Sequence, residues 1–429
     1  MDTNIGPNPL RDVPYMGVIF VVAEAVKRGF ENGHPDWCNL GQGQPEVGEM
    51  AGAPPRVLRV DLDPADCAYG PLAGTCELRE VIAAHYNRLF RQGKPSQYTA
   101  DNVSVASGGR LALTRAAAAL GPINCAYQLP DYSAYEDMFN LHIARLSPVA
   151  LRGRAEDGFA IPPDRLEAEV RDQGLGAFVL SNPCNPTGTI IEGDDLRRYV
   201  EISRETGMAL LADEFYSHFI FRPGPDGPDG DWVPGKAPIS AAAYVDDVEQ
   251  DPVMLVDGLT KNYRYPGWRI GWVVGPTNMV QSIARTASAL DGGPSCVAQR
   301  AALTVLDPQR ADQETDALRE VFCHKRNVMV ARLQKMGVRF AKPPASTFYC
   351  WGSLEDLPAP FNDGMEFFWR ALDRKVMTVP GAFFDVNPGK RRRGVSPYRQ
   401  WMRFSFGPHL ENLELGLSRL EAMLAGEGY

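Results

Sequence analysis

The chain has 429 residues, of which 44% are hydrophobic and 23% charged, and its formal net charge at pH 7 is −9. These values are typical of a globular protein with two or three domains. The negative charge argues against general binding to nucleic acids or anionic membranes. The first residues show no basic segment followed by an apolar one, and the apolar stretch 16–26 is too short to span a bilayer. We therefore expect a cytoplasmic protein with neither a nucleic-acid nor a membrane partner.

The cysteines and histidines give no sign of a metal site. Eight cysteines are scattered along the chain without a CxxC pair or zinc-type spacing, which fits reduced thiols in the cytosol. The six histidines are equally dispersed. Only His218 follows an acidic segment, and a packed or surface role explains it better than a ligand role. We expect no bound metal.

Short β-type runs alternate with helix-length segments through the middle of the chain. This alternation predicts a mostly parallel sheet covered by helices on both faces. The connection 258–268 contains Gly and Pro and is too short for a crossover helix, so the last strand is predicted to run antiparallel. Helices are expected at 111–120 and 194–206, and strands at 102–107, 124–129, 144–149, 177–181, 209–213, 253–257 and 269–275.

Two segments interrupt this pattern. Residues 222–238 are so rich in Pro, Gly and Asp that we predict a loop there, either a solvated insertion or a lid. Lys390 to Arg393 form a basic cluster in an acidic protein. A solvated turn is the simpler interpretation of this cluster, and a border of the substrate entrance is the alternative.

Lys261 lies just beyond the apolar run 252–256, and Arg269 follows eight residues later. A lysine held at a strand end is partly desolvated, which lowers its pKa and favours the neutral amine that forms Schiff bases. Arg269 could hold a phosphate of the same molecule. A pair of solvated surface charges explains these two residues alone about as well.

Three further segments favour a cofactor site. Residues 107–110 (SGGR) follow a predicted strand and open a helix, where free backbone N–H groups can bind phosphate. Residues 181–188 (SNPCNPTG) contain two Asn-Pro steps that predict a rigid, extended turn. Asp213 ends an apolar strand, three residues before Tyr216. A buried carboxylate needs a partner, which a protonated ring nitrogen or a structural hydrogen bond would supply.

In their order along the chain, these motifs resemble the fold-type I, pyridoxal-phosphate-dependent class I/II aminotransferases. The resemblance extends from residues 39–45 (NLGQGQP) to 401–405 (WMRFS). It implies pyridoxal 5'-phosphate as cofactor and an L-amino acid as substrate. It also implies a seven-stranded sheet in a large α-β-α domain at 46–305. The N-terminal segment 1–45 would then join a smaller α/β domain at 306–429.

The resemblance also assigns roles to individual residues. Lys261 matches the Schiff-base lysine, Asp213 the partner of the pyridine nitrogen, and Tyr216 and Asn185 the donors to the cofactor's phenolic oxygen. Tyr132 matches the aromatic residue that stacks on the cofactor ring. The phosphate site would comprise Gly109, Arg110, Thr260 and Arg269, with Tyr69 reaching the site of a neighbouring subunit, which implies a homodimer. Arg403 and the backbone of Gly43, together with Asn185, would bind the substrate carboxylate.

One position departs from the family pattern. Many relatives have a serine three residues before the lysine, and this chain has Gly258. A phosphate contact is therefore missing, which hints at a specialised reaction.

Transfer of an amino group to a 2-oxo acid is the expected reaction. Elimination, replacement, cyclisation and amino-acid oxidation remain alternatives on the same scaffold, and a non-catalytic cofactor sensor is a weaker one. The sequence does not decide which residues surround the substrate side chain. Arg285, Tyr15, Phe20 and Tyr349, and the loops 14–20 and 232–238, are candidates, although surface exposure or core packing would explain these side chains as well.

Overall fold

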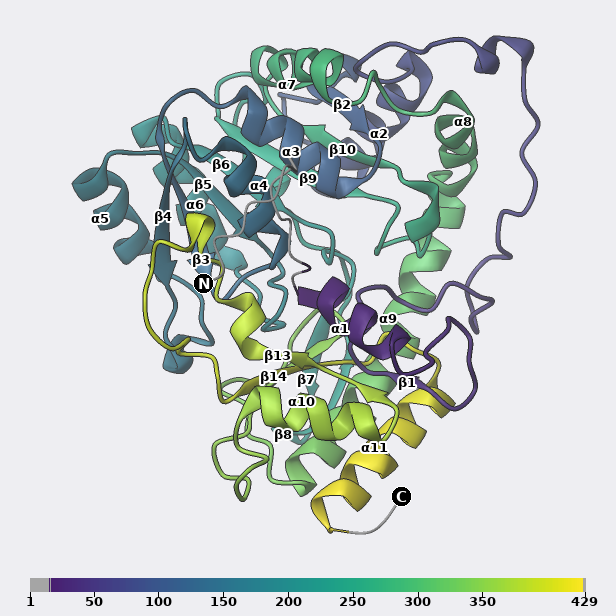
Figure 1. Cartoon of the computed structure of the whole chain (residues 1–429). Helices are drawn as coiled ribbons and strands as arrows, with labels where there is room; N and C mark the ends of the chain where they lie inside the picture. Colours follow the sequence, from purple (N-terminus) through teal and green to yellow (C-terminus); the bar gives the residue numbers. More distant parts are fainter. Residues whose placement is uncertain (1–14, 16, 427–429) are drawn as a thin grey trace, which may run out of the picture.

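A seven-stranded sheet forms the centre of the computed structural model, which describes residue 15 and residues 17–426 (Figure 1). The strand order is β2-β10-β9-β6-β5-β3-β4. β10 runs antiparallel to both of its neighbours, and the other pairings are parallel. The predicted fold class and the predicted antiparallel strand are therefore confirmed. The strands are β2 (Val103–Ala106), β3 (Asn124–Leu129), β4 (Ser147–Arg152), β5 (Leu175–Ser181), β6 (Ala209–Asp213), β9 (Val253–Gly258) and β10 (Gly271–Val274).

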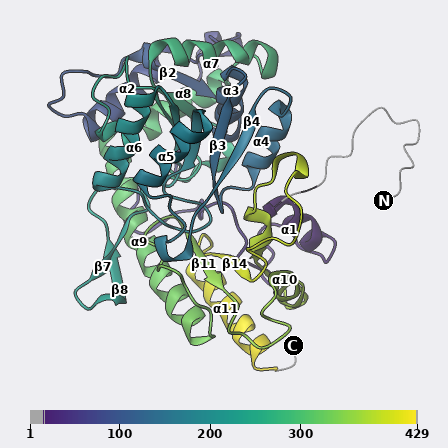
Figure 2. The ribbon, with the colours of Figure 1, turned by 90° about the vertical axis from the view of Figure 1, so that its left-hand side faces the viewer.

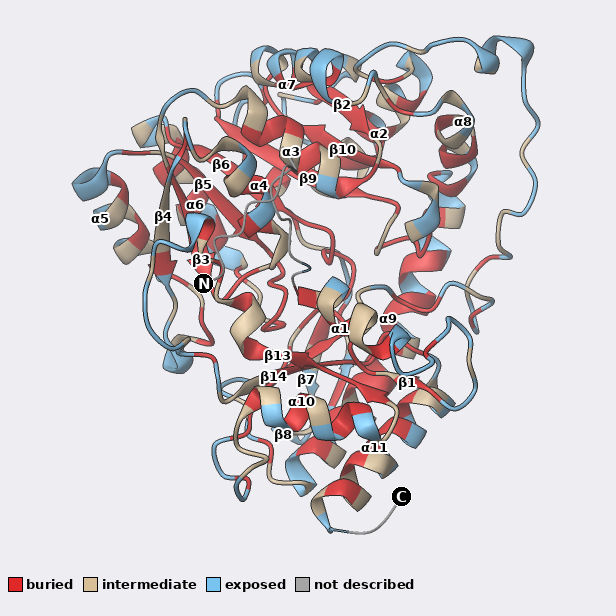
Figure 3. Ribbon diagram, viewed as in Figure 1, coloured by how far each residue is buried: buried red, intermediate tan, exposed pale blue. Residues whose placement is uncertain are grey.

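Helices cover the sheet on both faces. Successive residues of a strand point to opposite faces, so Val256 of β9 packs in one hydrophobic cluster and Leu255 in another. Burial on both sides explains why β6 and β9 are continuous apolar runs, and the strands are buried in Figure 3. Figure 2 shows α2 and α6 on one side of the sheet and α4 on the other. The helices are α1 (Gly17–Val26), α2 (Cys76–Phe90), α3 (Gly109–Ala119), α4 (Ala134–His142), α5 (Pro163–Gln173), α6 (Gly193–Thr206), α7 (Thr277–Leu290), α8 (Cys296–Val305), α9 (Pro308–Lys335), α10 (Gly364–Asp373) and α11 (Leu410–Leu424).

A second, smaller sheet lies in the C-terminal part of the chain. It has the order β11-β14-β13, formed by Tyr349–Ser353, Trp401–Ser405 and Val379–Pro380. β1 (Cys38–Asn39) pairs in parallel with β12 (Val376–Met377), so residues near both chain ends lie together, as Figure 1 shows. This pairing agrees with a small domain built from both ends. The domain boundaries at 45 and 305 stay predictions.

The sequence misplaced one strand. β4 was expected at 144–149 and is found three residues later. The backbone N–H groups of Arg145 and Leu146 both donate to the carbonyl of His142, so these residues close the end of α4 instead of entering the sheet.

The predicted loop at 222–238 is also wrong, because most of it forms a β-hairpin. β7 (Phe221–Gly224) pairs antiparallel with β8 (Gly227–Pro234). The buried Trp232 of β8 packs under the guanidinium of Arg326, 4.1 Å from the ring centroid, and its backbone carbonyl accepts a hydrogen bond from Asn327 Nδ2 at 2.8 Å. Packing against α9 therefore stabilises a segment whose Pro and Gly content is typical of a loop. Among the residues that the structure describes, no helix is long and apolar enough to cross a membrane.

Candidate active site

A cavity of about 660 Å³ opens at the carboxyl ends of the sheet strands. Ligands bind at this edge in parallel α/β sheets, because the loops there deliver side chains from several strands. The cavity brings together every predicted site residue except Tyr69. It is lined by Gly43, Gly109, Arg110, Tyr132, Asn185, Asp213, Tyr216, Thr260, Lys261, Arg269 and Arg403.

Asp213 lies at the end of β6 and is almost completely buried. The hydroxyl of Tyr135 donates a hydrogen bond to its Oδ2 at 2.8 Å. Burial raises the pKa of Asp213 to about 6, while the hydrogen bond from Tyr135 opposes this rise. A carboxylate held at this depth favours a cationic partner in the cavity.

Lys261 follows β9 and is part-buried, and its Nζ donates a hydrogen bond to the backbone carbonyl of Gly43. Burial, followed by the positive charges of Arg403, Arg269 and Arg110, lowers the pKa of Lys261 to about 7. The neutral amine is therefore well populated near neutral pH, as the sequence predicted for a nucleophilic lysine.

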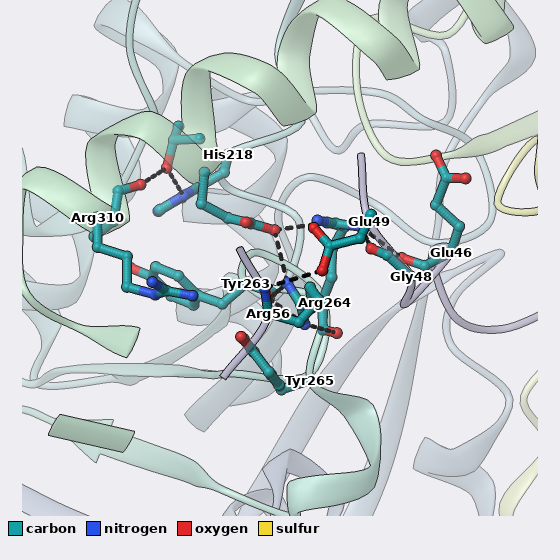
Figure 4. Close-up of polar contacts among 12 residues, drawn as sticks. Glu46, Gly48, Glu49, Arg56, His218, Tyr263, Arg264, Tyr265 and Arg310 are labelled. Atoms are coloured by element: carbon teal, nitrogen blue, oxygen red, sulfur yellow. Dashed lines mark hydrogen bonds and ion pairs between the residues drawn. The ribbon is translucent and has the colours of Figure 1, made fainter. Parts of the chain in front are cut away.

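The segment after Lys261 is fixed by a buried ion network. Glu314 of α9 accepts a hydrogen bond from Arg264 Nε at 2.6 Å and forms an ion pair with Arg56 at 3.4 Å. Arg56 also donates to the backbone carbonyl of Arg264 at 2.7 Å, and its guanidinium lies 3.6 Å from the ring centroid of Tyr265. Figure 4 shows Arg56 between Arg264 and Tyr265. This network holds the chain that carries Lys261.

Arg403 comes from β14 and is 1% exposed. Its Nη1 donates to Asn185 Oδ1 at 2.9 Å and its Nη2 to the carbonyl of Gly41 at 3.1 Å. The guanidinium lies 4.0 Å from the ring centroid of Tyr349, whose hydroxyl lies 3.1 Å from that of Tyr216. Arg403 Nε has no partner among the described residues. A buried arginine held in this way is suited to bind a planar carboxylate.

The opposite end of the cavity begins where α3 starts. Gly108 has φ +91°, and a Cβ there would lie 2.1 Å from Nη2 of Arg269. A Cβ on Gly109 would lie 2.0 Å from the ring of Phe215. Only glycines allow the guanidinium and the helix N-terminus to come this close. Free backbone N–H groups beside an arginine form an anion site, and Arg110 lies next to it with Nη2 3.2 Å from the hydroxyl of Tyr132.

The position of Gly258 has a structural explanation. Gly258 pairs with Gly271 of β10, and a Cβ on Gly258 would lie 2.4 Å from the carbonyl oxygen of Ile270 and 2.6 Å from Cα of Gly271. The missing serine is therefore a consequence of close backbone packing between β9 and β10. It does not by itself indicate a different reaction.

Several other candidates lie outside the cavity. Tyr69 is fully exposed, and Arg285 is exposed on α7. Phe20 packs against Phe383, with ring centroids 5.3 Å apart, which is a core contact. Neither Tyr15 nor residues 232–238 line the cavity, and Pro14 and Met16 lie outside the described residues. Of the four side chains considered for the substrate pocket, Tyr349 alone lines it.

The basic cluster is also away from the cavity. Lys390 forms an ion pair with Glu136 at 2.5 Å, and Arg392 pairs with Asp385 at 2.7 Å. None of residues 390–393 lines the cavity. The place of the cluster relative to the entrance stays a prediction, and its ion pairs join its own loop to α4.

Sequence reasoning missed Tyr135, which contacts the cavity residue Asp213 but does not itself line the cavity. Tyr135 lies three residues after Tyr132, and the first turn of α4 brings it to Asp213. Its position three residues after Tyr132 was the available signal. Val18 and Ile19 belong to the candidate segment 14–20, and they do line the cavity. The lining residues that were missed are Val22, Asn32, Asn39, Gln42, Gln44, Leu113, Ser133, Ala134, Asp137, Phe215, Pro266 and Gly267.

Known proteins share this architecture. An aspartate aminotransferase of Sulfurisphaera tokodaii is 25% identical over 393 residues, covering 90% of this chain and 89% of its own. An aspartate/prephenate aminotransferase of Cereibacter sphaeroides is 26% identical, covering 91% and 92%. The structure of aspartate aminotransferase from Thermus thermophilus with maleate superposes with a TM-score of 0.76 at 22% identity, covering 96% of this chain and 100% of that one.

The family match agrees with the fold and with the gathering of the predicted residues in one cavity. The family described as aminotransferase class I and II matches residues 35–420, which is most of the chain. This chain therefore belongs to the class I and II aminotransferases.

Proposed function

We propose that this aminotransferase binds pyridoxal 5'-phosphate in the 660 Å³ cavity and transfers the amino group of an L-amino acid to a 2-oxo acid. The observation that carries the proposal is the convergence of three groups in one cavity: a lysine with a pKa of about 7, a buried carboxylate and a buried arginine. Each of these groups is costly to bury without a ligand that uses it.

The residues present fit the cofactor. The glycine cradle at Gly108 and Gly109, with Arg269 and Thr260, would hold its phosphate. Asp213 would pair with its ring nitrogen, Tyr132 would stack on the ring, and Tyr216 and Asn185 would donate to its phenolic oxygen. When bound, pyridoxal phosphate supplies an electron sink for the pair left when a bond to the substrate Cα breaks.

The chain's own residues would direct this chemistry. Lys261 Nζ can accept and return a proton at Cα, because its lowered pKa leaves both protonation states accessible near pH 7. Arg403 would bind the α-carboxylate, with the backbone of Gly43 beside it. This contact would orient the substrate and so determine which bond at Cα lies perpendicular to the cofactor ring. The Asp213 carboxylate would keep the ring nitrogen protonated.

A homodimer would complete the site. Tyr69 is fully exposed in the single chain, and so are parts of the extended segment that precedes it, where Leu58 is 87% exposed. Figure 1 shows this segment along one outer edge of the molecule. Exposed apolar side chains of this kind mark interfaces. We infer that the segment packs on a second copy, where Tyr69 reaches the cofactor phosphate.

We further infer a cytoplasmic location, which the eight free cysteines support.

Two measurements test the function. The wild-type protein with pyridoxal phosphate should show the visible absorbance band of the covalently bound cofactor, and Lys261→Ala should lack it. The wild type should then be incubated with amino acids, beginning with aspartate because relatives are named for it, with and without 2-oxo acids. Formation of the matching 2-oxo acid by mass spectrometry is the expected result. Release of ammonia, hydrogen peroxide or a cyclic product would instead favour the specialised chemistries. A band retained in Lys261→Ala would contradict the assignment of this lysine.

A further inference from the structure

Asn262, the residue that follows the cavity lysine, is completely buried and does not itself line the cavity. Its side-chain amide nevertheless has hydrogen-bond partners on two segments. Nδ2 donates to Oδ1 and Oδ2 of Asp257, both at 3.0 Å, and to Oγ of Ser217 at 3.1 Å. Nδ2 also donates to the carbonyl oxygen of Glu214 at 3.4 Å, and Oδ1 accepts from the backbone N–H of His218 at 3.2 Å.

The chemistry of these neighbours determines the orientation of the amide. The backbone N–H of His218 can only donate, so it requires the oxygen of Asn262. The carbonyl of Glu214 can only accept, so it requires the nitrogen. Both polar atoms of the side chain are therefore paired, at a depth where an unpaired amide would be costly. The amide is held in one orientation and in one place.

The contact with Asp257 closes the loop that carries Lys261. Asp257 belongs to β9 and is buried. It lies four residues before Lys261, and Asn262 lies one residue after it. The two hydrogen bonds between Asp257 and Asn262 therefore join the two ends of a short loop. A loop whose ends are joined has fewer conformations, so the backbone of Lys261 is restricted.

The other contacts of Asn262 join this loop to the turn after β6. β6 and β9 are neighbouring parallel strands in Figure 1. Their backbone pairing ends with the hydrogen bond from the N–H of Glu214 to the carbonyl of Val256 at 2.8 Å. Beyond it, every hydrogen bond between residues 214–218 and 257–263 in the described part of the chain involves the side chain of Asn262.

The turn after β6 carries two of the proposed cofactor contacts. Asp213 ends β6, and Tyr216 lies in the turn that follows. Both line the cavity together with Lys261. Because Asn262 is bonded to both segments, its amide determines how Lys261 lies relative to Asp213 and Tyr216. A misplacement of reacting groups by about 1 Å can lower a rate on the order of 100-fold, so this placement matters for catalysis.

We propose that Asn262 is a positioning residue for Lys261, and that it holds Nζ where this atom reaches both the cofactor and the substrate Cα. The inference rests on the function proposed above, because it uses the role given to Lys261. Burial and three nearby arginines lower the pKa of Lys261, so the proton affinity of its nitrogen depends on where that nitrogen lies. A nitrogen released from this place would contact water and gain proton affinity.

Asn262→Ala in the cofactor-loaded protein tests the proposal. The pH midpoint of the visible absorbance band of the bound cofactor should rise by roughly half a unit or more. With the amino acid that reacts best, kcat should fall roughly tenfold or more while KM changes less than about threefold, because Arg403 is unaltered. Ser217→Ala removes one acceptor of the Asn262 amide and should cause the same changes at smaller size. It keeps the test valid if Asn262→Ala does not fold.

Asn102→Ala is the matched control. Asn102 is also completely buried, its Nδ2 has three acceptors of its own within 3.3 Å, and it does not line the cavity. This variant should lose unfolding free energy and keep the wild-type midpoint and kcat. If Asn262→Ala behaves like this control, its role is only structural and the proposal is overturned. A wild-type midpoint and kcat in Ser217→Ala, when Asn262→Ala does not fold, overturns it too. A wild-type protein without the band would contradict the proposed function itself, and this inference with it.

Discussion

The hydroxyl of Tyr135 donates a hydrogen bond to Oδ2 of Asp213 at 2.8 Å, and both side chains are buried. A donor at this position stabilises the carboxylate form and lowers the pKa of Asp213 against the effect of burial. The charge of Asp213, which is proposed to pair with the cofactor ring, therefore depends on a residue of α4 as well as on β6.

Tyr135→Phe should raise the pKa of Asp213 above about 6, because the opposing hydrogen bond is lost. Less carboxylate is then present at pH 7, and kcat/KM should fall by roughly tenfold. The acidic limb of the pH profile should move to higher pH, which a purely structural loss would not cause. Tyr244→Phe is the control, because Tyr244 is partly buried and does not line the cavity. An unchanged acidic limb would show that Tyr135 does not tune Asp213.

Arg403→Lys should raise KM for the amino acid by roughly 10- to 100-fold, because an ammonium group cannot make the paired contacts of a guanidinium. The absorbance of the bound cofactor should remain, since Arg403 lies at the substrate end of the cavity. Steady-state kinetics with the best substrate provide the measurement. Arg285→Lys, on the exposed face of α7, should leave KM unchanged. A KM equal to that of the wild type in Arg403→Lys would show that Arg403 does not bind the substrate carboxylate.

Gly258→Ser should destabilise the protein instead of improving cofactor binding. The new Cβ would lie 2.4 Å from the carbonyl oxygen of Ile270, so β9 and β10 must separate. The expected loss of unfolding free energy is about 2 to 4 kcal/mol, within the range for overpacked buried sites. Chemical denaturation measures this loss. Gly121→Ser, where a Cβ would meet nothing within 4 Å, should have no effect. A more stable Gly258→Ser protein with tighter cofactor binding would contradict the packing explanation.

Two inactive variants should restore activity when their subunits are mixed. Tyr69→Ala and Lys261→Ala remove groups that, in the proposed dimer, serve one site from different chains. A mixed dimer then contains one intact site and one doubly altered site. Random exchange should recover about a quarter of wild-type activity, because half of the dimers are mixed and each has one intact site. Mixing without recovery, in a sample shown to exchange subunits, would rule out the shared site.

The buried Glu214 should make stability depend on pH. Burial raises its pKa from 4.5 to about 8, although Ser240 and the backbone N–H of Ala241 hydrogen-bond to it. Because the folded-state pKa is the higher one, this contribution to stability is complete below about pH 4.5 and is lost as pH rises through 8. The loss is on the order of 5 kcal/mol. Glu214→Gln should lack this component of the pH dependence in denaturant titrations of the cofactor-free protein. The same dependence of unfolding free energy on pH in the wild type and in Glu214→Gln would contradict the prediction.

Local patterns were sufficient to predict most of the sheet and, together with the family resemblance, the polar residues that meet in the cavity. Lys261, Asp213 and Asn185 each follow a buried apolar strand, and parallel strands bring such positions to one edge. Tyr135 was missed because its contact with Asp213 depends on the path of α4 across the sheet end. The β7–β8 hairpin was missed because Trp232 is held by Arg326 and Asn327 of α9, and no local pattern reveals a partner so distant in sequence.

The pairing of β1 with β12 has a consequence for how the enzyme is made. Gly43 and Gln44 of the cavity wall follow β1, whose partner Val376–Met377 lies far along the chain. On the ribosome, the sheet can form early from its own neighbouring strands, while β1 has no partner until Val376–Met377 have been synthesised. The cavity wall that faces Lys261 is completed only by this later pairing, so a nascent chain that still lacks Val376–Met377 should be inactive.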